Sequence, residues 1–319
     1  MNIQKLLHCC AGVSAALLLA TTAYAGAPQI KSQAPGYYRM NLGDFEVTAL
    51  SDGTFQAPLD KLLTNTTPAK TDKALAAAFL KNPVETSVNA YLINTGTKLV
   101  LIDTGAGGYF GPTLGNLLVN LKAAGYSPEQ VDEIYITHMH ADHIGALLSG
   151  GKIAFPNAIV RADKRESDFW VSQEHLDAAP KDNKDFFKDA IEALTPYIAA
   201  GKFKPFDGDT ELVPGVKALA SRGHTPGHTT YVVESQGQKL ALWGDLIHAA
   251  AVQFPSPAVT IAFDSDSKAA AVQREKAFVD AAKNGYWVAA AHLPFPGIGH
   301  LRASGTGYTW VPANYTSLR

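Results

Sequence analysis

The sequence predicts one α/β domain in which layers of helices cover mixed or antiparallel β-sheets. Three observations support this. Strand-like and helix-like segments alternate along the chain. The alternation lacks the regular strand–helix–strand repeat of a doubly wound parallel sheet. Some strand-like segments are also separated only by a short turn, as in a hairpin. No linker, repeat or low-complexity tract interrupts the chain after about residue 35, so we expect a single domain over residues 36–319.

The expected strands are short segments rich in β-branched and apolar residues, bounded by turn residues. In chain order they are Phe45–Leu50, Val88–Asn94, Lys98–Ile102, Ile134–Thr137, Ala158–Arg161, Thr229–Val233, Lys239–Leu242 and Trp287–Ala291. The expected helices are the longer segments between them, Pro112–Ala124, Asp163–Ser172, Lys184–Ala200 and Ser267–Lys283. The turn Thr95-Gly96-Thr97 and a second turn at Gly237 each predict a hairpin between neighbouring strands.

The first residues predict an export signal. Lys5 supplies a positive charge, Ala11–Ala20 is apolar, and Ala23-Tyr24-Ala25 is a small-x-small cleavage site. The apolar segment is shorter than the roughly 20 residues that span a bilayer. We therefore expect residues 1–25 to be a signal peptide, residues 26–35 to be a flexible lead-in, and the protein to be periplasmic or secreted. A signal anchor that stays attached is the alternative.

The remaining composition excludes several function classes. Signal cleavage would remove the only two cysteines, Cys9 and Cys10, and with them any thiol nucleophile or Cys-type zinc site. The net charge of −2 gives no support to nucleic-acid binding. Beyond the signal, no segment is apolar enough to span a membrane.

A dense group of metal-binding side chains occurs in Thr137-His138-Met139-His140-Ala141-Asp142-His143. It directly follows the strand-like segment Val131–Ile136, and ligands bind at the carboxyl ends of strands in α/β sheets. Three imidazoles and a carboxylate this close would repel one another or lose solvation without a cation between them. The segment therefore predicts a metal site.

Further candidate ligands follow downstream in similar positions. His224 lies in a Gly/Pro loop before a strand, and Asp245 and His292 each follow an apolar strand. Together with the first group they give too many ligands for one tetrahedral zinc. They suit two cations about 3.5–4 Å apart that share a bridging carboxylate.

These residues resemble the metallo-β-lactamase superfamily, through its H-x-H-x-D-H motif followed by a lone His, a lone Asp and a last His. The turn Ile102-Asp103-Thr104-Gly105 matches another usual feature of that superfamily. The resemblance implies an αβ/βα four-layer sandwich with mixed sheets. It is closest to the methyl parathion hydrolase and dihydrocoumarin-type lactonase branch, through the segments Gly36–Arg39, Gly43–Val47, Glu85–Asn89 and Phe295–His300.

The resemblance also implies how the ligands are shared between two metals. They form two groups of three and one bridging carboxylate: His138, His140 and His224; Asp142, His143 and His292; and Asp245. Asp103 would orient a ligand histidine by accepting its free N–H. Zinc is the expected metal, and manganese, cobalt and iron suit the same ligands.

The expected substrate pocket adjoins the metals. His248 follows the bridging Asp245 by three residues, and it is either a catalytic hydrogen-bond donor to a substrate oxygen or a wall residue. Asp142 or Asp245 would carry the proton during catalysis. His228 is expected to make loop hydrogen bonds. The remaining residues expected to bind substrate are apolar: Phe110, Trp170, Phe186, Ile261 and Phe263.

The expected activity is hydrolysis of a lactone by a hydroxide that bridges the two metals. An aryl lactone such as dihydrocoumarin is the favoured small-molecule substrate, and weaker hydrolysis of organophosphates is expected beside it. Hydrolysis of β-lactams is a further possibility. Two alternatives remain: an organophosphate triester hydrolase, and a non-catalytic metal-binding scaffold on the same fold. The closest relatives suggest a homodimer.

Overall fold

The computed structural model describes residues 27–318. The expected signal peptide, residues 1–25, lies outside them. Residues 27–34 contain no helix or strand, and the chain from Pro35 onward forms one compact unit. Among the described helices, none is long and apolar enough to cross a membrane.

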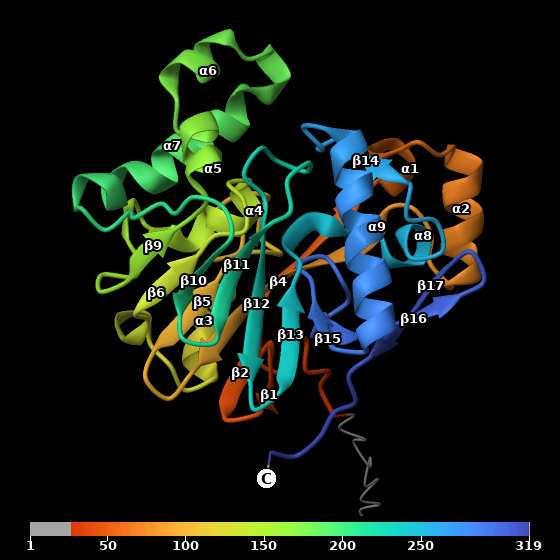
Figure 1. The fold of residues 1–319 in the computed structure, drawn as a ribbon, viewed down its shortest axis with the longest axis horizontal. Coiled ribbons are helices and arrows are strands. Elements are labelled where there is room, and N and C mark those ends of the chain that lie inside the picture. The colour runs from red at the N-terminus through yellow and green to blue at the C-terminus, as the bar shows by residue number, and fades with distance from the viewer. Residues whose placement is uncertain (1–26, 319) are drawn as a thin grey trace, which may run out of the picture. The chain divides into compact units, whose positions relative to one another are not determined.

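Two mixed sheets form the centre of this unit (Figure 1). In spatial order, the six strands of the first sheet are β1 (Tyr37–Leu42), β2 (Phe45–Ala57), β4 (Val84–Asn94), β5 (Leu99–Ile102), β6 (Glu133–Tyr135) and β9 (Ile159–Arg161). The seven strands of the second sheet are β10 (Thr210–Val213), β11 (Val216–Ala220), β12 (Thr229–Ser235), β13 (Gln238–Leu242), β15 (Trp287–Ala289), β16 (Ile298–Ser304) and β17 (Gly307–Pro312). Most neighbours are antiparallel, whereas β5–β6, β6–β9 and β13–β15 are parallel. Both expected hairpins, β4–β5 and β12–β13, are present.

The helices and the remaining short strands lie outside the two sheets. The helices are α1 (Leu59–Leu62), α2 (Pro68–Ala77), α3 (Leu117–Ala123), α4 (Ala141–Ile144), α5 (Lys164–Trp170), α6 (Gln173–Ala178), α7 (Lys184–Ala199), α8 (Ala250–Gln253) and α9 (Ser267–Asn284). The short strands β3 (Leu63–Thr64) and β14 (Thr260–Ile261) pair with each other, as do β7 (Leu148–Ser149) and β8 (Lys152–Ile153).

The buried apolar residues confirm the predicted four layers. One cluster lies between the sheets and joins Ile93 of β4 to Val233 of β12. A second packs helices α3 and α7 on the first sheet. A third packs Phe278 of α9 on Val288 of β15, and Figure 1 shows α9 beside β13 and β15. Each sheet therefore has one face toward the other sheet and one toward helices, as in an αβ/βα sandwich.

Three expected boundaries are wrong by four residues or more, and the first is that the strand expected from Val88 already begins at Val84. The strand expected over Phe45–Leu50 continues as β2 to Ala57, because a bulge between Ser51 and Gly53 lets it keep pairing with β4. The helix expected over 112–124 begins only at Leu117. The preceding residues form a loop whose backbone N–H groups at Ala106, Gly115 and Leu117 donate to the buried Asp52 carboxylate.

The carboxyl ends of strands from both sheets converge on one region. The loops after β5 and β6 come from the first sheet, and those after β13 and β15 from the second. Because β5–β6 and β13–β15 are parallel pairs, the residues that follow each pair emerge at the same edge. The predicted metal ligands follow β6, β11, β13 and β15.

Candidate metal centre

The first group of candidate ligands is held by the segment between β6 and α4. After β6 ends at Tyr135, His138 and His140 lie in an extended connection, and Asp142 and His143 lie in the short helix α4. The helix is tied to the loop after β5, because Thr104 N donates to His143 O over 2.7 Å. Four candidate ligands are thus presented within one short turn of chain.

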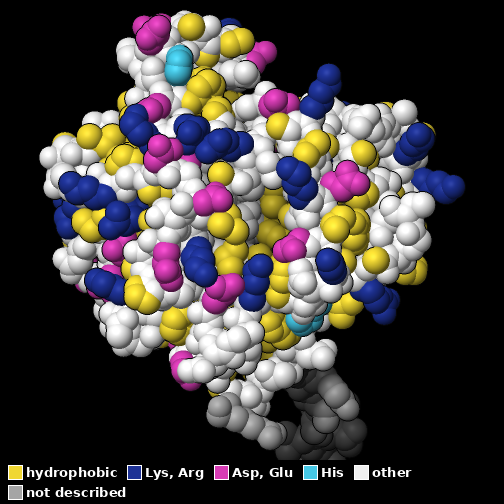
Figure 2. All heavy atoms as spheres, viewed as in Figure 1, with side chains coloured by type: hydrophobic (Ala, Val, Ile, Leu, Met, Phe, Trp, Pro, Cys, Tyr) yellow, Lys and Arg dark blue, Asp and Glu magenta, His cyan; other side chains and the backbone are white. Residues whose placement is uncertain are grey.

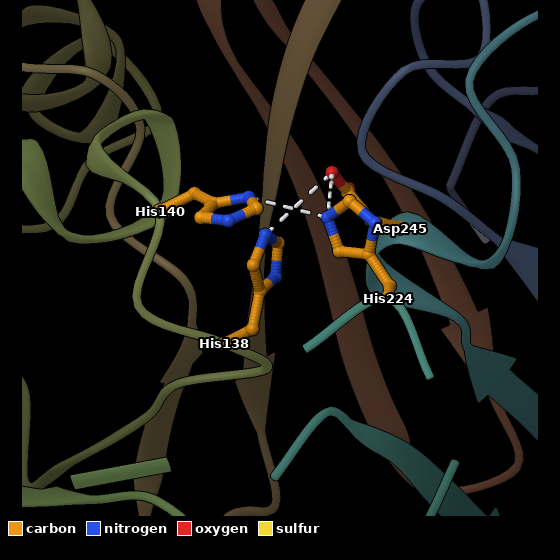
Figure 3. A group of neighbouring side chains, drawn as sticks. All are labelled: His138, His140, His224 and Asp245. Atoms are coloured by element: carbon orange, nitrogen blue, oxygen red, sulfur yellow. Dashed lines mark hydrogen bonds and ion pairs between the residues drawn. The ribbon is translucent and has the colours of Figure 1, made fainter. Parts of the chain in front are cut away.

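The other candidate ligands come from the second sheet. His224 lies in the β11–β12 loop, Asp245 in a 3-10 turn after β13, and His292 in the loop after β15. Figure 3 shows His138, His140 and His224 grouped around the Asp245 carboxylate. Residues up to 154 positions apart in sequence therefore meet at one centre.

The side chains of the expected ligands form two groups with Asp245 between them, and a third, overlapping group joins Asp245 and His292 to His248. Single ligand atoms of His138, His140, His224 and Asp245 all lie within 4.8 Å of one another, and the same holds for the group Asp142, His143 and His292. Asp245 Oδ2 lies 3.4 Å from His224 Nε2, whereas Asp245 Oδ1 lies 3.3 Å from His143 Nε2. Asp245 Oδ2 also lies 3.2 Å from His292 Nε2, so this one carboxylate contacts both groups, as a bridging ligand requires.

The donor set fits two divalent cations. Within residues 27–318, His138 Nε2, His143 Nε2 and Asp245 Oδ1 are buried at this centre and have no hydrogen-bond partner. Buried polar atoms normally have partners, and an unsatisfied one indicates a missing ion or water. Imidazole nitrogen and carboxylate oxygen are ligands that zinc and similar cations accept.

The electrostatics of the centre also favour added positive charge. Despite the opposing effect of burial, the neighbouring imidazoles hold the pKa of Asp245 well below its usual range, so this carboxylate is ionised. Burial opposes protonation of His292 as well, but Asp245 and Asp142 outweigh it and raise its pKa to about 10. The carboxylates therefore draw protons onto nearby imidazoles, where bound cations would displace them.

Comparison with known proteins identifies the family. The sequence profile of the Metallo-beta-lactamase superfamily matches residues 83–292, from the start of β4 to the last candidate ligand. The chain belongs to the metallo-beta-lactamase superfamily. Among solved members, it resembles the hydrolase AbOPH, with a TM-score of 0.85 and 38% identity covering 90% of this chain and 100% of that one.

Other superfamily members similar to the chain are lactonases by name. The solved structure of AidC, described as a dizinc quorum-quenching lactonase, has a TM-score of 0.82 and 29% identity, covering 88% of this chain and 99% of AidC. An N-acyl homoserine lactonase of Bacillus cereus is 26% identical over 217 residues, which cover 62% of this chain and 78% of the relative. One from Bacillus sp is 31% identical over 165 residues, but the match spans only 58% of its length.

Carboxylates hold the histidines of this superfamily member in place. Asp103 Oδ2 lies 2.8 Å from His143 Nδ1, and the same carboxylate accepts from Thr137 N and Oγ1. His224 Nδ1 has the equivalent contact with Asp264 Oδ1, also at 2.8 Å. Each contact leaves the histidine Nε2 directed at the centre. Sequence reasoning missed Asp264, because it lies in no motif and its partner is 40 positions away.

Two further buried residues connect the loops of the centre. Glu166 of α5 accepts hydrogen bonds from Met139 N, Thr225 Oγ1 and Gly227 N, and so joins the segment of the first motif to the β11–β12 loop. Sequence reasoning also missed Glu166, which looks like an ordinary acid near a helix start. His228 makes the loop hydrogen bonds expected of it, since its Nε2 accepts from Asp245 N over 3.0 Å.

A small apolar cavity of about 150 Å³ opens above the candidate ligands. Of the residues expected to bind substrate, Phe110, Phe186, Ile261, Phe263 and His248 line it. Sequence reasoning missed other apolar wall residues, which come from β2 and α1: Phe55, Ala57, Leu59 and Leu62. Asp142, Asp245 and His292 belong to the polar part of its lining.

Trp170 is a correction to the expected pocket. It does not line the cavity and is only 5% exposed. Its ring packs into the core under the first sheet, 4.7 Å from the ring of Phe187 between centroids, and lies behind the rings of His140 and Phe186. Neighbouring Phe186 faces the cavity in its place.

Proposed function

We propose that this chain is a metal-dependent lactonase that binds two divalent cations. The observation that carries the proposal is the convergence of two candidate ligand groups, joined by Asp245, at the base of an apolar cavity. The similarity to proteins named as lactonases supports the choice of reaction within a chemically diverse superfamily.

We assign the cations to the residues as the geometry groups them. His138, His140 and His224 would hold one, Asp142, His143 and His292 the other, and Asp245 both. Zinc is the proposed metal because its usual ligands are those present. When bound, two such cations supply a nucleophile from water at neutral pH and polarise the ester carbonyl.

Asp142 is the residue best placed to move the proton. Its side chain is 18% exposed and lines the cavity, whereas that of Asp245 is 4% exposed and surrounded by imidazoles. Burial alone would raise the pKa of Asp142. The neighbouring His143 and His292 have the larger effect and lower this pKa below its usual range, so the carboxylate is ionised. It can accept a proton from the attacking water and pass it to the oxygen released by ring opening.

His248 is proposed to contact the substrate. It lines the cavity, and its Nε2 lies 3.0 Å from Asp245 Oδ2. Burial lowers the pKa of His248, so a neutral imidazole faces the substrate. Its single N–H faces Asp245 here; once cations hold that carboxylate, the same N–H can donate to a lactone oxygen without adding a charge to the apolar cavity.

An aryl lactone such as dihydrocoumarin is the proposed substrate class. An apolar cavity of about 150 Å³ is large enough for benzene, and this cavity has the same volume. Phe55, Phe110, Phe186 and Phe263 line its walls, and no Lys or Arg occurs in its described lining. Aromatic walls suit a neutral ring, and the lack of a cation disfavours anionic esters. Figure 2 shows acidic and basic side chains interspersed on the molecular face in view, so this face has no large, purely basic surface of the kind that attracts a polyanion.

A substrate panel on metal-loaded protein tests the proposal. We expect kcat/KM to be highest for dihydrocoumarin, lower for an N-acyl homoserine lactone and lowest for an aryl phosphotriester. Asp142→Asn should lower every lactone rate, whereas His175→Gln, which changes an exposed histidine of α6, should change none. A phosphotriester rate well above the lactone rates would make triester hydrolysis the main activity. Full metal loading without turnover of any ester would support the scaffold alternative.

A further inference from the structure

The loop formed by residues 246–264, called here the wall loop, carries three of the cavity-lining side chains. His248 lies near its start, and Ile261 and Phe263 near its end. Its only regular elements are α8, with four residues, and the two-residue strand β14. Elements this short do not fix their own position, so other contacts must determine where these walls stand.

Gln253 connects the two ends of the wall loop. Its side chain is fully buried, and Oε1 accepts from the backbone N–H groups of His248 and Ala249 over 2.8 and 2.9 Å. Its Nε2 donates to Val259 O over 3.0 Å. One amide therefore fixes the backbone of His248 relative to the residues just before Ile261.

Arg274 holds the same two ends from outside the loop. It projects from α9, is fully buried, and its Nε donates to Leu246 O. Its Nη1 donates to Pro257 O over 2.9 Å and to Val259 O over 2.6 Å. Val259 O thus accepts from both Gln253 and Arg274, which makes it the junction of one network.

The chemistry of this network favours a geometric role over simple stabilisation. Within residues 27–318, the hydrogen-bond partners of the buried guanidinium are carbonyl oxygens, its Nη2 has no partner, and the charge of Asp264 acts on it from beyond ion-pair contact. Burial lowers the pKa of Arg274 to about 10. An apolar side chain of similar size often gives a core at least the same stability as a buried charge. Directed hydrogen bonds such as those of Arg274 instead specify one backbone conformation.

We propose that Gln253 and Arg274 are positioning residues that set the substrate selectivity of the cavity through the wall loop. Neither side chain lines the cavity, and neither contacts a candidate metal ligand. They act by fixing the backbone within two residues of His248 and Ile261. The proposal rests on the proposed function for the identity of the substrate.

The test compares Gln253→Met and Arg274→Met with wild type on dihydrocoumarin and on the small aliphatic δ-valerolactone. We expect the ratio of the two kcat/KM values to change about tenfold or more, because displacement by 1 Å can cost about a hundredfold. Most of the change should be in KM for the aryl lactone. Metal content and the visible spectrum of the cobalt-substituted protein should match wild type, since the ligands are not moved.

Further variants separate positioning from loss of stability. Arg274→Lys keeps one donor and should fall between wild type and Arg274→Met, and Gln253→Glu keeps the two bonds accepted by Oε1. If the Met variants do not fold, these two carry the test. Leu121→Ala, in the core under the first sheet, should lower stability but leave the selectivity ratio unchanged. An unchanged ratio in folded, metal-loaded wall-loop variants would overturn the proposal.

A binding measurement keeps this test independent of turnover. The lactam analogue 3,4-dihydroquinolin-2-one has the shape of dihydrocoumarin but resists ring opening. Its Kd, measured by calorimetry, should rise about tenfold in Gln253→Met and Arg274→Met. If wild type binds the lactam but opens no lactone, the proposed function fails while the positioning role stands. Equal affinities in wild type and both variants would refute the positioning role.

Discussion

Replacing Glu166 by Gln should weaken both the fold and metal binding. The buried carboxylate accepts from Met139 N on Oε1, and from Thr225 Oγ1 and Gly227 N on Oε2. The Gln amide can keep its oxygen toward Thr225 Oγ1 and Gly227 N. Its NH₂ group then faces the Met139 N–H, which is also a donor. One of three hydrogen bonds to a charged acceptor is then lost, and the other two become neutral.

The expected cost follows from these contacts. Losing a hydrogen bond to a charged group costs about 1.5–3 kcal/mol, and neutralising the acceptor of the other two costs about 1 kcal/mol each. Burial raises the pKa of Glu166, so removing its charge returns part of this loss. We therefore expect a net destabilisation of about 2–4 kcal/mol. Because Met139 lies between His138 and His140, zinc affinity should also fall about 10–100-fold.

Two measurements check this prediction. Guanidinium denaturation of metal-free protein gives the free energy of unfolding, and competition with a chelating dye gives the zinc affinities. Glu174→Gln, which changes an exposed acid of α6, is the matched control and should alter neither. If Glu166→Gln unfolds at the wild-type denaturant concentration and binds zinc with wild-type affinity, Glu166 does not hold the two ligand loops together.

Three further predictions concern single residues. Asp103→Asn removes the charged partner of His143 Nδ1 and should lower the affinity for one of the two zinc ions about 10–100-fold. The same dye competition measures both affinities, and finding both unchanged would contradict this prediction. Burial, Asp185 and Glu192 raise the pKa of Asp189 to about 6, so the folded protein binds the extra proton and loses stability as the pH rises from about 4 through 6. Asp189→Asn should therefore raise the Tm more at pH 8 than at pH 4, and an equal shift at both would argue against it. Trp170→Phe should reduce stability but leave KM for dihydrocoumarin within about twofold of wild type, because the ring lies in the core; a large rise in KM would return Trp170 to the cavity wall.

The sequence was sufficient to predict the candidate ligands because all but His224 follow a recognisable strand, and His224 precedes one. His138, Asp245 and His292 are placed by strand ends, and strand ends of one sheet edge necessarily meet. The layered fold followed from the same alternation of segments. These features depend on periodicity and on local order along the chain, which a single sequence contains.

The residues that sequence reasoning missed depend on contacts between distant segments. Asp264 and Glu166 look like ordinary acids, and only the packed fold brings them to His224 and to Met139. Trp170 was assigned to the pocket for the same reason. The sequence indicates only that this side chain lies near the site, whereas packing decides that its ring faces the core and not the cavity. The sequence thus indicates which groups can bind metal, whereas packing decides which groups orient them.

The structure separates the parts that hold the candidate ligands from the parts that form the cavity walls. Asp103 and Glu166 hold candidate ligands and do not line the cavity, whereas Asp264, at the end of the wall loop, contacts both His224 Nδ1 and Ile261 N. The walls come from β2, α1, the loop before α3, α7 and the wall loop. Residues far apart with no shared partners contribute independently to free energies. Substitutions of wall residues that contact neither a candidate ligand nor Asp264 can therefore change which ester fits without changing metal affinity. Substitutions at Asp103 and Glu166 should lower turnover of all esters by a similar factor.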